Sequence, residues 1–467
     1  MIQFPRLGNL KDTVTSILAA GAFLAAACGA VRAENRGFPM AIAYPGCIKP
    51  NTVDQAAMNK AVLDFWTYYK AKYVKPSNGG AQGGGFYVEM HGTGAGSGDK
   101  TTSEAHGYGM IFSVLMAGPG GDPDGRKYFD GFFNMFDKNR SGGNSALMSW
   151  VIGQGENSHA NSATDGDMDI AYALILAHYQ WGSNGSVNYL KEAQRVINEG
   201  IRKSEMGQDS HRTMLGDWDK NGWNTRSSDW MADHMQAYQK ATGDAFWDEA
   251  RRTVYGLIGN LTATTSGSTG LMPDFVVGNP PKPAGPNFLE AQTDGDFSWN
   301  ACRYPLRLAV DYAHYGSPES KAALAKVSAW IKGSTGGNPA TIKAGYHLEG
   351  SALSAYSDMS FTAPLVASSI ADASNQDFLN KGWAHLSSAK QDSYYGDSIE
   401  LLSMLLITGN WWAADDRVTA IGREPGKGVP RDGMGFPPAA AVSLDGRLVV
   451  PARSRAGGSY LIGYPSR

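Results

Sequence analysis

The chain of 467 residues has few cysteines, few charged residues and no long apolar run. Three cysteines are too few for a disulfide-built fold, and the sequence leaves open whether Cys47 and Cys302 pair. No C-x-x-C pair or His-rich tract is present, so we expect no metal site and no cofactor. Charged residues make up 18% of the chain, below the roughly 25% typical of soluble domains. The 58 glycines predict many turns and loops instead.

The first 33 residues have the pattern of an export signal. Arg6 and Lys11 precede the apolar stretch 17–29, and a small-residue cleavage site follows at 31–33. This stretch is too short to span a membrane, and no later segment reaches about 18 uninterrupted apolar residues. We predict a signal peptide, no stable membrane insertion and a secreted protein, extracellular or periplasmic. Cys28 leaves lipidation open.

The net charge of −3 is unevenly distributed along the chain. Residues 1–33 carry +2 and residues 423–467 carry +4, which leaves −9 for residues 34–422. Phosphate binding requires a basic surface, so this acidic body argues against a nucleic-acid partner. It is compatible with a neutral or a cationic ligand.

Apolar residues recur at helical spacing through most of 34–422, and alternating, strand-like runs are rare before residue 440. The expected helices are 54–73, 170–181, 187–203, 227–242, 245–260, 301–315, 317–332, 377–388 and 397–408, with another starting at Met110. No Pro-rich linker divides them, so we predict one all-α domain over 34–422. A toroid of helical hairpins, the (α/α) barrel, fits this length and would place a cleft among the loops at one end. An irregular helical bundle is the alternative. Residues 423–467, rich in Pro, Gly and Arg, are expected to form a tail with a short strand within 441–450.

Acidic residues stand beside small and aromatic ones in four segments. The first is Thr101–Met110, in which Glu104 precedes an apolar helix. In the second, three acids alternate at Asp165, Asp167 and Asp169; a calcium loop would need Gly and Glu at positions that hold Ile and Leu, so this reading is excluded. The third, 288–307, leads from an acidic loop to Arg303 and Arg307, and the fourth runs over 394–412. A phosphate loop is excluded upstream because Asp99 interrupts its Gly-Lys-Thr.

Together these segments resemble glycoside hydrolase family 8 over about residues 45–412. The most specific match is Ala163-Thr-Asp-Gly-Asp-x-x-Ile-Ala-x-Ala-Leu, ending at Trp181. Ser-Glu104-x-x-Gly-Tyr-Gly-Met, Asn-Ala-Cys-Arg303 and Tyr-Tyr-x-Asp-Ser are further matches in the family's order. The resemblance implies an (α/α)6 barrel and endo-acting hydrolysis of β-1,4-linked glycans with inversion at the anomeric carbon.

The resemblance also implies catalytic roles. An inverting glycosidase needs a protonated carboxyl and a carboxylate that activates water, roughly 6.5–9.5 Å apart. Glu104 matches the family's general acid and Asp165 its acidic residue at the cleft centre. Many members carry the base where this chain has Asn300, which cannot accept a proton. A subgroup that includes chitosanases and lichenases uses a Glu in the preceding loop; Glu290 resembles it, with Asp294 and Asp296 as alternatives.

Sugar rings stack on aromatic faces with polar groups at the rim, so we expect substrate contacts from aromatic and polar residues near these motifs. The candidates are Tyr108, Trp150, Trp218, Trp223, Arg226, Asp229, Trp230, Asp296, Asn300, Arg303 and Tyr395. For Arg226 and Asp229 a structural ion pair is the alternative interpretation.

The predicted function is a secreted, inverting endo-glycosidase, expected to be a monomer, with a polysaccharide as its partner. Chitosan is the predicted substrate because the body is acidic and the subgroup contains chitosanases. Candidates to bind its ammonium groups are Glu156, Asp229, Asp294 and Asp296. The alternative is an endo-β-glucanase of the lichenase or cellulase type. Less favoured are a polysaccharide lyase, which would want a basic groove, and a glycan-binding protein that has lost its base.

Overall fold

The computed structural model describes residues 35–77, 85–90, 99–153 and 160–417, with the backbone of 441–442 and 448–449. Contacts divide the chain into two units, Met1–Ile421 and Gly422–Arg467. The predicted signal peptide lies outside the described residues, as does most of the tail. The signal peptide and the secreted location therefore stay predictions.

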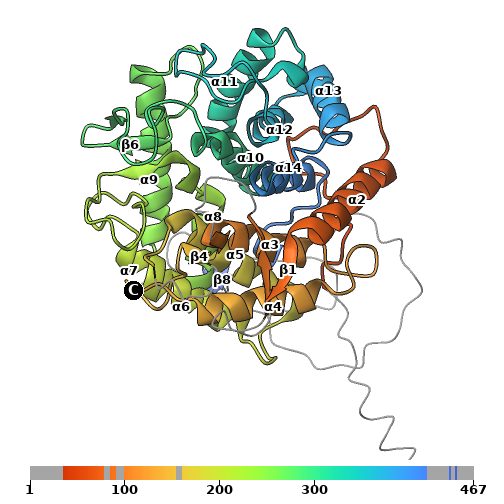
Figure 1. The fold of residues 1–467 in the computed structure, drawn as a ribbon, viewed down its shortest axis with the longest axis vertical. Coiled ribbons are helices and arrows are strands. Elements are labelled where there is room, and N and C mark those ends of the chain that lie inside the picture. Colours follow the sequence, from red (N-terminus) through yellow and green to blue (C-terminus); the bar gives the residue numbers. More distant parts are fainter. Residues whose placement is uncertain are drawn as a thin grey trace, which may run out of the picture. The chain divides into compact units, whose positions relative to one another are not determined.

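Inner and outer helices alternate along the described part of the first unit (Figure 1). The inner helices are α3 (Ser103–Leu115), α5 (Thr164–Trp181), α8 (Ala232–Thr242), α10 (Tyr304–Tyr315), α12 (Met359–Ala367) and α14 (Tyr394–Ile407). Each packs against the next, and α14 returns to α3, so the inner ring is closed.

The outer helices each cover one inner helix. They are α2 (Gln55–Tyr73), α4 (Gly125–Lys138), α6 (Tyr189–Arg195), α9 (Phe246–Thr264), α11 (Pro318–Ser334) and α13 (Gln376–Leu386). After α6 the chain continues through a π-helical segment, Val196–Ile201, into α7 (Arg202–Ser204). The architecture is the (α/α)6 barrel that the sequence predicts.

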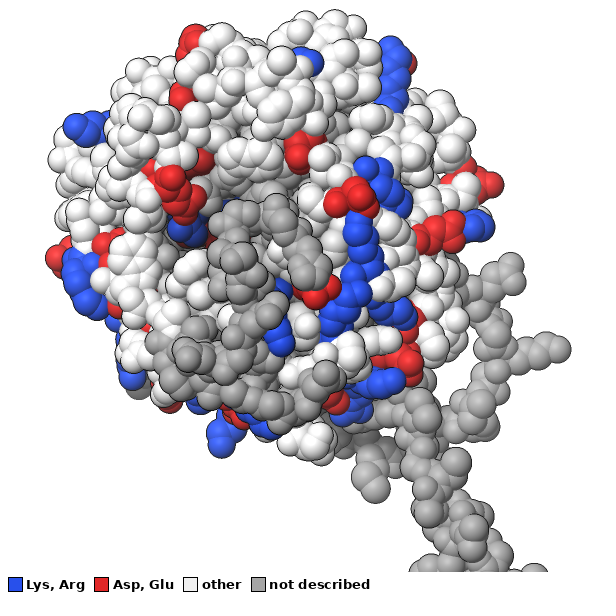
Figure 2. Space-filling view, viewed as in Figure 1, with Lys and Arg blue, Asp and Glu red and all other residues white. Residues whose placement is uncertain are grey.

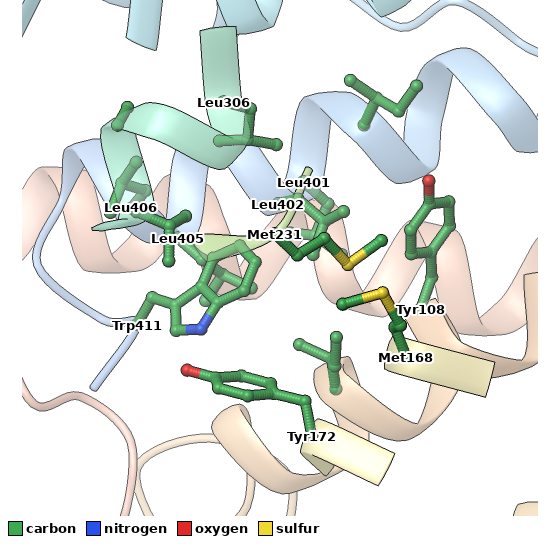
Figure 3. Close-up of a cluster of buried hydrophobic side chains, with 14 of the residues drawn as sticks. Tyr108, Met168, Tyr172, Met231, Leu306, Leu401, Leu402, Leu405, Leu406 and Trp411 are labelled. Carbon is green, nitrogen blue, oxygen red and sulfur yellow. The ribbon is translucent and has the colours of Figure 1, made fainter. Parts of the chain in front are cut away.

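Burial separates the two rings. Every residue of α5 from Thr164 to Ala177 is buried, as expected of a helix that is enclosed on all sides. By contrast, α4 buries mainly one face, which carries several phenylalanines. The centre of the barrel holds a cluster of apolar side chains that includes Tyr172, Leu405 and Trp411 (Figure 3). Although α5 is apolar, the described part of the chain contains no helix with an apolar run suited to crossing a membrane.

The contact between α3 and α5 depends on glycine. A Cβ atom built at Gly166 would lie 2.3 Å from Ser103 Oγ, and one at Gly107 would lie 2.6 Å from Asp169 Cβ. The two helices can approach this closely because these positions have no side chain. This approach brings the first turns of α3 and α5 together.

Short antiparallel strands lie in the loops between the helices. The pairs are β1 (Val74–Ser77) with β2 (Gly85–Val88), β3 (Asp99–Thr102) with β4 (Val151–Gly153), and β5 (Thr225–Arg226) with β6 (Phe275–Val277), which also pairs with β7 (Lys282–Pro283). In register, Thr102 faces Val151 and Arg226 faces Phe275. Both pairings lie next to residues of the site described below.

Several expected boundaries differ from the structure. Two helices were not predicted, α4, which contains two glycines, and α12, which contains Pro364, because both residue types disfavour helix interiors. Helix α5 begins six residues before the predicted start at 170, since its polar first turn is buried. In the second unit, the single strand expected within 441–450 is instead a pair, β8 (Ala441–Val442) and β9 (Leu448–Val449).

Candidate active site

A cavity of about 980 Å³ lies where inner helices begin. Its lining includes Glu104 in the first turn of α3, Asp165 in the first turn of α5 and Tyr394 at the start of α14. Arg303 and Asp358, which immediately precede α10 and α12, line it too. The barrel therefore gathers residues that are far apart in sequence at one end.

Glu104 is the carboxyl that α3 brings to the cavity. Its Oε1 accepts a hydrogen bond from the Tyr394 hydroxyl at 2.8 Å, and its Oε2 pairs with Arg303 Nη1. Burial raises the pKa of Glu104 to about 7; Arg303 acts to lower it and the neighbouring Asp165 to raise it. This carboxyl can therefore carry a proton near neutral pH.

Asp165 lies beside Glu104 but in a different electrostatic environment. Its Oδ2 accepts from Arg303 Nη1 at 2.7 Å and lies 3.8 Å from Arg226 Nη1. Burial acts to raise the pKa of Asp165, but the two guanidinium groups outweigh burial and hold it below its usual value. Asp165 therefore stays ionised while Glu104 can be protonated, which is the separation that acid–base chemistry uses.

Glu290 reaches the same cavity from the loop that follows β7. Its Oε1 accepts from Arg226 Nη2 at 3.2 Å and its Oε2 from Asn300 Nδ2 at 2.8 Å. Asn300 Oδ1 in turn accepts from Arg303 Nη2 at 3.1 Å. An amide and a guanidinium thus link Glu290 to Glu104. The Glu290 side chain is 44% exposed, so a water molecule can reach it.

The two alternative bases occupy other positions. Asp294 is fully buried and accepts three backbone N–H bonds from residues 289–291. Asp296 lies 2.9 Å from His347 Nδ1 and does not line the cavity. Of the three acidic residues in this loop, the structure brings Glu290 alone to the cavity.

Large exposed aromatic side chains line the cavity. Trp150 and Trp218, both predicted, are 42% and 38% exposed, and the predicted Tyr395 also lines it. Trp299, which was not predicted, is 42% exposed, and its ring packs edge-on against Phe361 at 5.1 Å. These rings offer the flat apolar surfaces on which pyranose rings stack.

Besides Asp296, four predicted substrate contacts are placed elsewhere. Tyr108 is buried in the central apolar cluster, 3.4 Å from Arg303 Nη1 (Figure 3). Trp230 is buried and donates to Thr225 Oγ1 at 3.0 Å. Asp229 is buried, accepts from Ser228 Oγ at 2.8 Å, and burial raises its pKa to about 7. Trp223 lines a separate cavity of about 430 Å³.

Asp229 is placed behind the cavity wall, and no ion pair joins it to Arg226 among the described residues. Arg226 instead turns towards Asp165 and Glu290. Glu156, a candidate for binding ammonium groups, lies outside the described residues. The polar and aromatic segment 226–230 therefore supplies one side chain to the cavity, while Asp229 and Trp230 are buried.

Sequence reasoning missed three residues that shape the site. Trp299 and Tyr394 directly precede the predicted Asn300 and Tyr395, so adjacency to those residues was the available signal. Asp274 is buried and accepts backbone N–H bonds from Ser298, Asn300 and Ala301. It carries no motif, and nothing in the sequence marks it.

Cys47 and Cys302 are not paired. Cys302 is buried with its Sγ 3.2 Å from the Trp299 carbonyl oxygen. Over the described ranges, no group of three or more His, Cys, Asp or Glu side chains is arranged to hold a metal ion.

Comparisons with known proteins agree with this geometry. The family model described as glycosyl hydrolases family 8 matches residues 37–409. An endoglucanase of Bacillus sp. (strain KSM-330) is 42% identical over 389 residues, covering 82% of this chain and 83% of the relative. A beta-glucanase of Niallia circulans is 41% identical over 397 residues, covering 82% of this chain and 93% of the relative.

Solved structures show the same fold. The apo structure of a beta-1,3-1,4-glucanase from Paenibacillus sp. X4 is similar with a TM-score of 0.77 and 40% identity, covering 81% of this chain and 99% of that one. A xylanase from Teredinibacter turnerae has a TM-score of 0.66 at 19% identity, covering 78% and 95% of the two chains, and shows the likeness of fold alone.

Proposed function

The chain belongs to glycosyl hydrolase family 8, and on this premise we propose that it is an inverting endo-β-glucanase that cleaves β-1,4 bonds in neutral glucans. The observation that carries the proposal is the pair Glu104 and Glu290. Both line one cavity, and an amide and a guanidinium lie between them. An inverting enzyme needs such a separation between its acid and its base, because a water molecule must enter between the base and the sugar.

Glu104 acts as the general acid. Its raised pKa, about 7, keeps a large share of the carboxyl protonated near neutral pH. The proton passes to the glycosidic oxygen as the bond to the anomeric carbon breaks, so the departing sugar leaves as an alcohol. The Tyr394 hydroxyl, which donates to Oε1, fixes the orientation of the carboxyl.

Glu290 acts as the general base. It takes a proton from water while the water oxygen attacks the anomeric carbon on the face opposite the leaving group. Asn300 and Arg226 hold one carboxylate oxygen each, so the carboxylate is oriented but still partly open to solvent. Asn300 therefore positions the base rather than acting as one.

Asp165 supports the transition state. Arg303 and Arg226 keep it ionised beside Glu104. A fixed negative charge at this point stabilises the positive charge that develops on the sugar ring, and it also favours the protonated form of Glu104.

The proposed substrate is a neutral glucan and not chitosan, chiefly because of the relatives. Among the described residues, the charged side chains of the lining are Glu104, Asp165, Glu290, Asp358, Arg226 and Arg303, and their net charge is −2 when all are ionised. With Glu104 protonated the value is −1. The face in Figure 2 is mostly uncharged, with acidic and basic groups interspersed. The relatives named endoglucanase and beta-glucanase favour the same alternative over chitosan.

The test is a substrate panel combined with product stereochemistry. Reducing-sugar release is measured on lichenan, carboxymethylcellulose, xylan and highly deacetylated chitosan at equal mass and low salt. We expect turnover on the β-glucans to exceed turnover on chitosan, and NMR of early products to show the α-anomer first. Preferential turnover of chitosan would overturn the substrate, and an initial β-anomer would overturn the mechanism.

A further inference from the structure

Two buried aspartates lie behind the wall of the cavity that carries Glu290. Asp274 and Asp294 are 3% and 0% exposed, and neither lines the cavity. Each accepts three backbone N–H bonds, and every donor belongs to the segments that present Glu290 and Asn300. Buried side chains bonded to the backbone in this way contribute to the geometry of the site and do not touch the substrate.

Asp294 grips the loop of the base with both carboxylate oxygens. Oδ2 accepts from the N–H groups of Leu289 at 2.7 Å and Glu290 at 3.0 Å, and Oδ1 accepts from Ala291 at 2.8 Å. The same turn is closed by the Asn287 N–H, which donates to the Ala291 carbonyl at 2.8 Å. The backbone on either side of Glu290 is therefore tied to one buried group.

Asp274 grips the neighbouring turn with a single oxygen. Its Oδ1 accepts from Ser298 at 3.1 Å, Asn300 at 3.0 Å and Ala301 at 2.6 Å. Burial raises the pKa of Asp274 to about 8 against the lowering effect of these donors. A neutral amide could therefore replace this side chain and keep all three hydrogen bonds.

The two turns are also joined to each other. The Asp274 N–H donates to the Asp296 carbonyl at 2.8 Å, and the Phe275 N–H donates to the Asp294 carbonyl at 3.0 Å. Phe275 pairs with Arg226 between β6 and β5, and Arg226 holds Glu290 Oε1. Strand β6 thus connects the two turns with the arginine that touches the base.

This support matters because no helix fixes the backbone of Glu290. Glu104 and Asp165 lie in the first turns of packed helices, whereas Glu290 lies in a loop and its side chain is 44% exposed. A shift of about 1 Å in a catalytic group can cost on the order of 100-fold in rate. The backbone hydrogen bonds to Asp274 and Asp294 supply the rigidity that a helix gives to the other two carboxyls.

We propose that Asp274 and Asp294 are positioning residues that hold Glu290 and Asn300 in the positions that water activation requires. This inference rests on the proposed role of Glu290 as the base. It assigns to Asp294, an alternative base in the sequence analysis, a role that acts through Glu290.

Asp294 accepts hydrogen bonds with both carboxylate oxygens, whereas Asp274 accepts them with one. Substitution by Asn should therefore affect the two positions differently. Asp294→Asn replaces an acceptor by an N–H donor, so at least one grip is lost, and kcat on lichenan should fall about tenfold or more with KM within about twofold. Asp274→Asn should stay within about threefold of the wild type, whereas Asp274→Ala should lose about tenfold or more in kcat. Thermal midpoints are measured for every variant.

Asp311→Asn is the matched control for burial. Asp311 is fully buried and accepts from Tyr255 and Ser320 on helices α9 and α11, outside the cavity lining. Its substitution should lower the thermal midpoint without changing kcat. If it lowers kcat as Asp294→Asn does, the effect is general destabilisation, and the positioning role is overturned.

A double-mutant cycle with Glu290→Gln separates this inference from the proposed function. Glu290→Gln alone should lower kcat by about 100-fold or more, and adding Asp294→Asn should cost less than about twofold further, because residues that act as a unit are not additive. Near-normal kcat in Glu290→Gln overturns the base and with it this inference. Loss in Glu290→Gln but normal kcat in Asp294→Asn overturns the positioning role alone. If Asp294→Asn does not fold, the contrast between Asp274→Asn and Asp274→Ala decides.

Discussion

Replacing Glu104 by Gln removes a proton donor while keeping the size of the side chain. Its burial has a definite consequence: at pH 7 a carboxyl with a pKa of about 7 is half protonated, whereas an ordinary Glu would be protonated to about 0.3%. The fold therefore raises the population of the acid form roughly 150-fold. General-acid catalysis adds about 10²–10⁴-fold, and we expect Glu104→Gln to lose kcat on lichenan in that range.

The assay compares two leaving groups. On lichenan the departing sugar needs a proton, but an aryl β-cello-oligosaccharide with an acidic phenol does not. The variant should therefore keep kcat on the aryl substrate within about tenfold of the wild type while failing on the polymer. In the wild type, activity on lichenan should fall as pH rises through about 7, since Glu104 must be protonated; the variant should lose this alkaline limb on the aryl substrate.

Glu249→Gln is the control, because Glu249 is an exposed carboxylate paired with Arg252 on an outer helix. It should leave kcat and the thermal midpoint unchanged. A folded Glu104→Gln protein that retains more than about a tenth of wild-type kcat on lichenan would refute the acid role. An equal loss on both substrates would place the defect outside leaving-group protonation.

Three further outcomes follow from the structure. Trp299→Ala should raise KM for lichenan roughly 2- to 12-fold with a smaller effect on kcat, because one exposed stacking surface is lost; KM measured on oligosaccharides of increasing length checks this. Glu400 is fully buried, neither of its carboxyl oxygens has a hydrogen-bond partner in the described part of the chain, and burial raises its pKa to about 9. Because the folded pKa lies above the unfolded value, its contribution to stability is complete below about pH 4.5 and declines by about 1.4 kcal/mol per pH unit up to about pH 9. Urea unfolding at pH 5 and pH 8 should show this slope flattened in Glu400→Gln, and an unchanged slope would contradict it. Activity in excess EDTA should equal that of the untreated enzyme; a loss that one added metal restores would contradict the expected absence of a metal.

The fold was predictable where apolar periodicity is strong. Most inner and outer helices follow from it, and the buried helix α5 was recognised from its continuous apolar run. The start of α5 was not, because Asp165 and Asp167 look like loop residues until their buried partners, Arg303 and the Met148 N–H, are known. Tertiary contacts decide such boundaries, and a single sequence does not show them.

The carboxyls that line the cavity were predictable from motifs, but the other residues of its walls were less so. Asp229 and Trp230 stand in a polar, aromatic segment typical of a cleft, yet both are buried, with Ser228 Oγ donating to Asp229 Oδ1 and Trp230 Nε1 donating to Thr225 Oγ1. Trp299 shows the opposite case: it is exposed in the cavity, but no sequence pattern indicated this. Whether an aromatic residue packs inward or outward depends on the turn that carries it.

The two arginines one turn apart at the start of α10 show how the fold and the chemistry depend on each other. Arg303 donates to Asp165, and Arg307 donates to Asp169 through two hydrogen bonds of 2.9 and 2.7 Å. We call the Arg303–Asp165 contact the outer rung and the Arg307–Asp169 contact the inner rung. The inner rung at Asp169 is fully buried, and it fixes the register of the helices. The outer rung opens into the cavity, where Arg303 also pairs with Glu104. A slip of α10 by one turn in either direction would leave one of the two aspartates without its arginine, and Arg303 would no longer serve both Asp165 and Glu104. The barrel register is therefore itself a condition for the acid–base separation at its end.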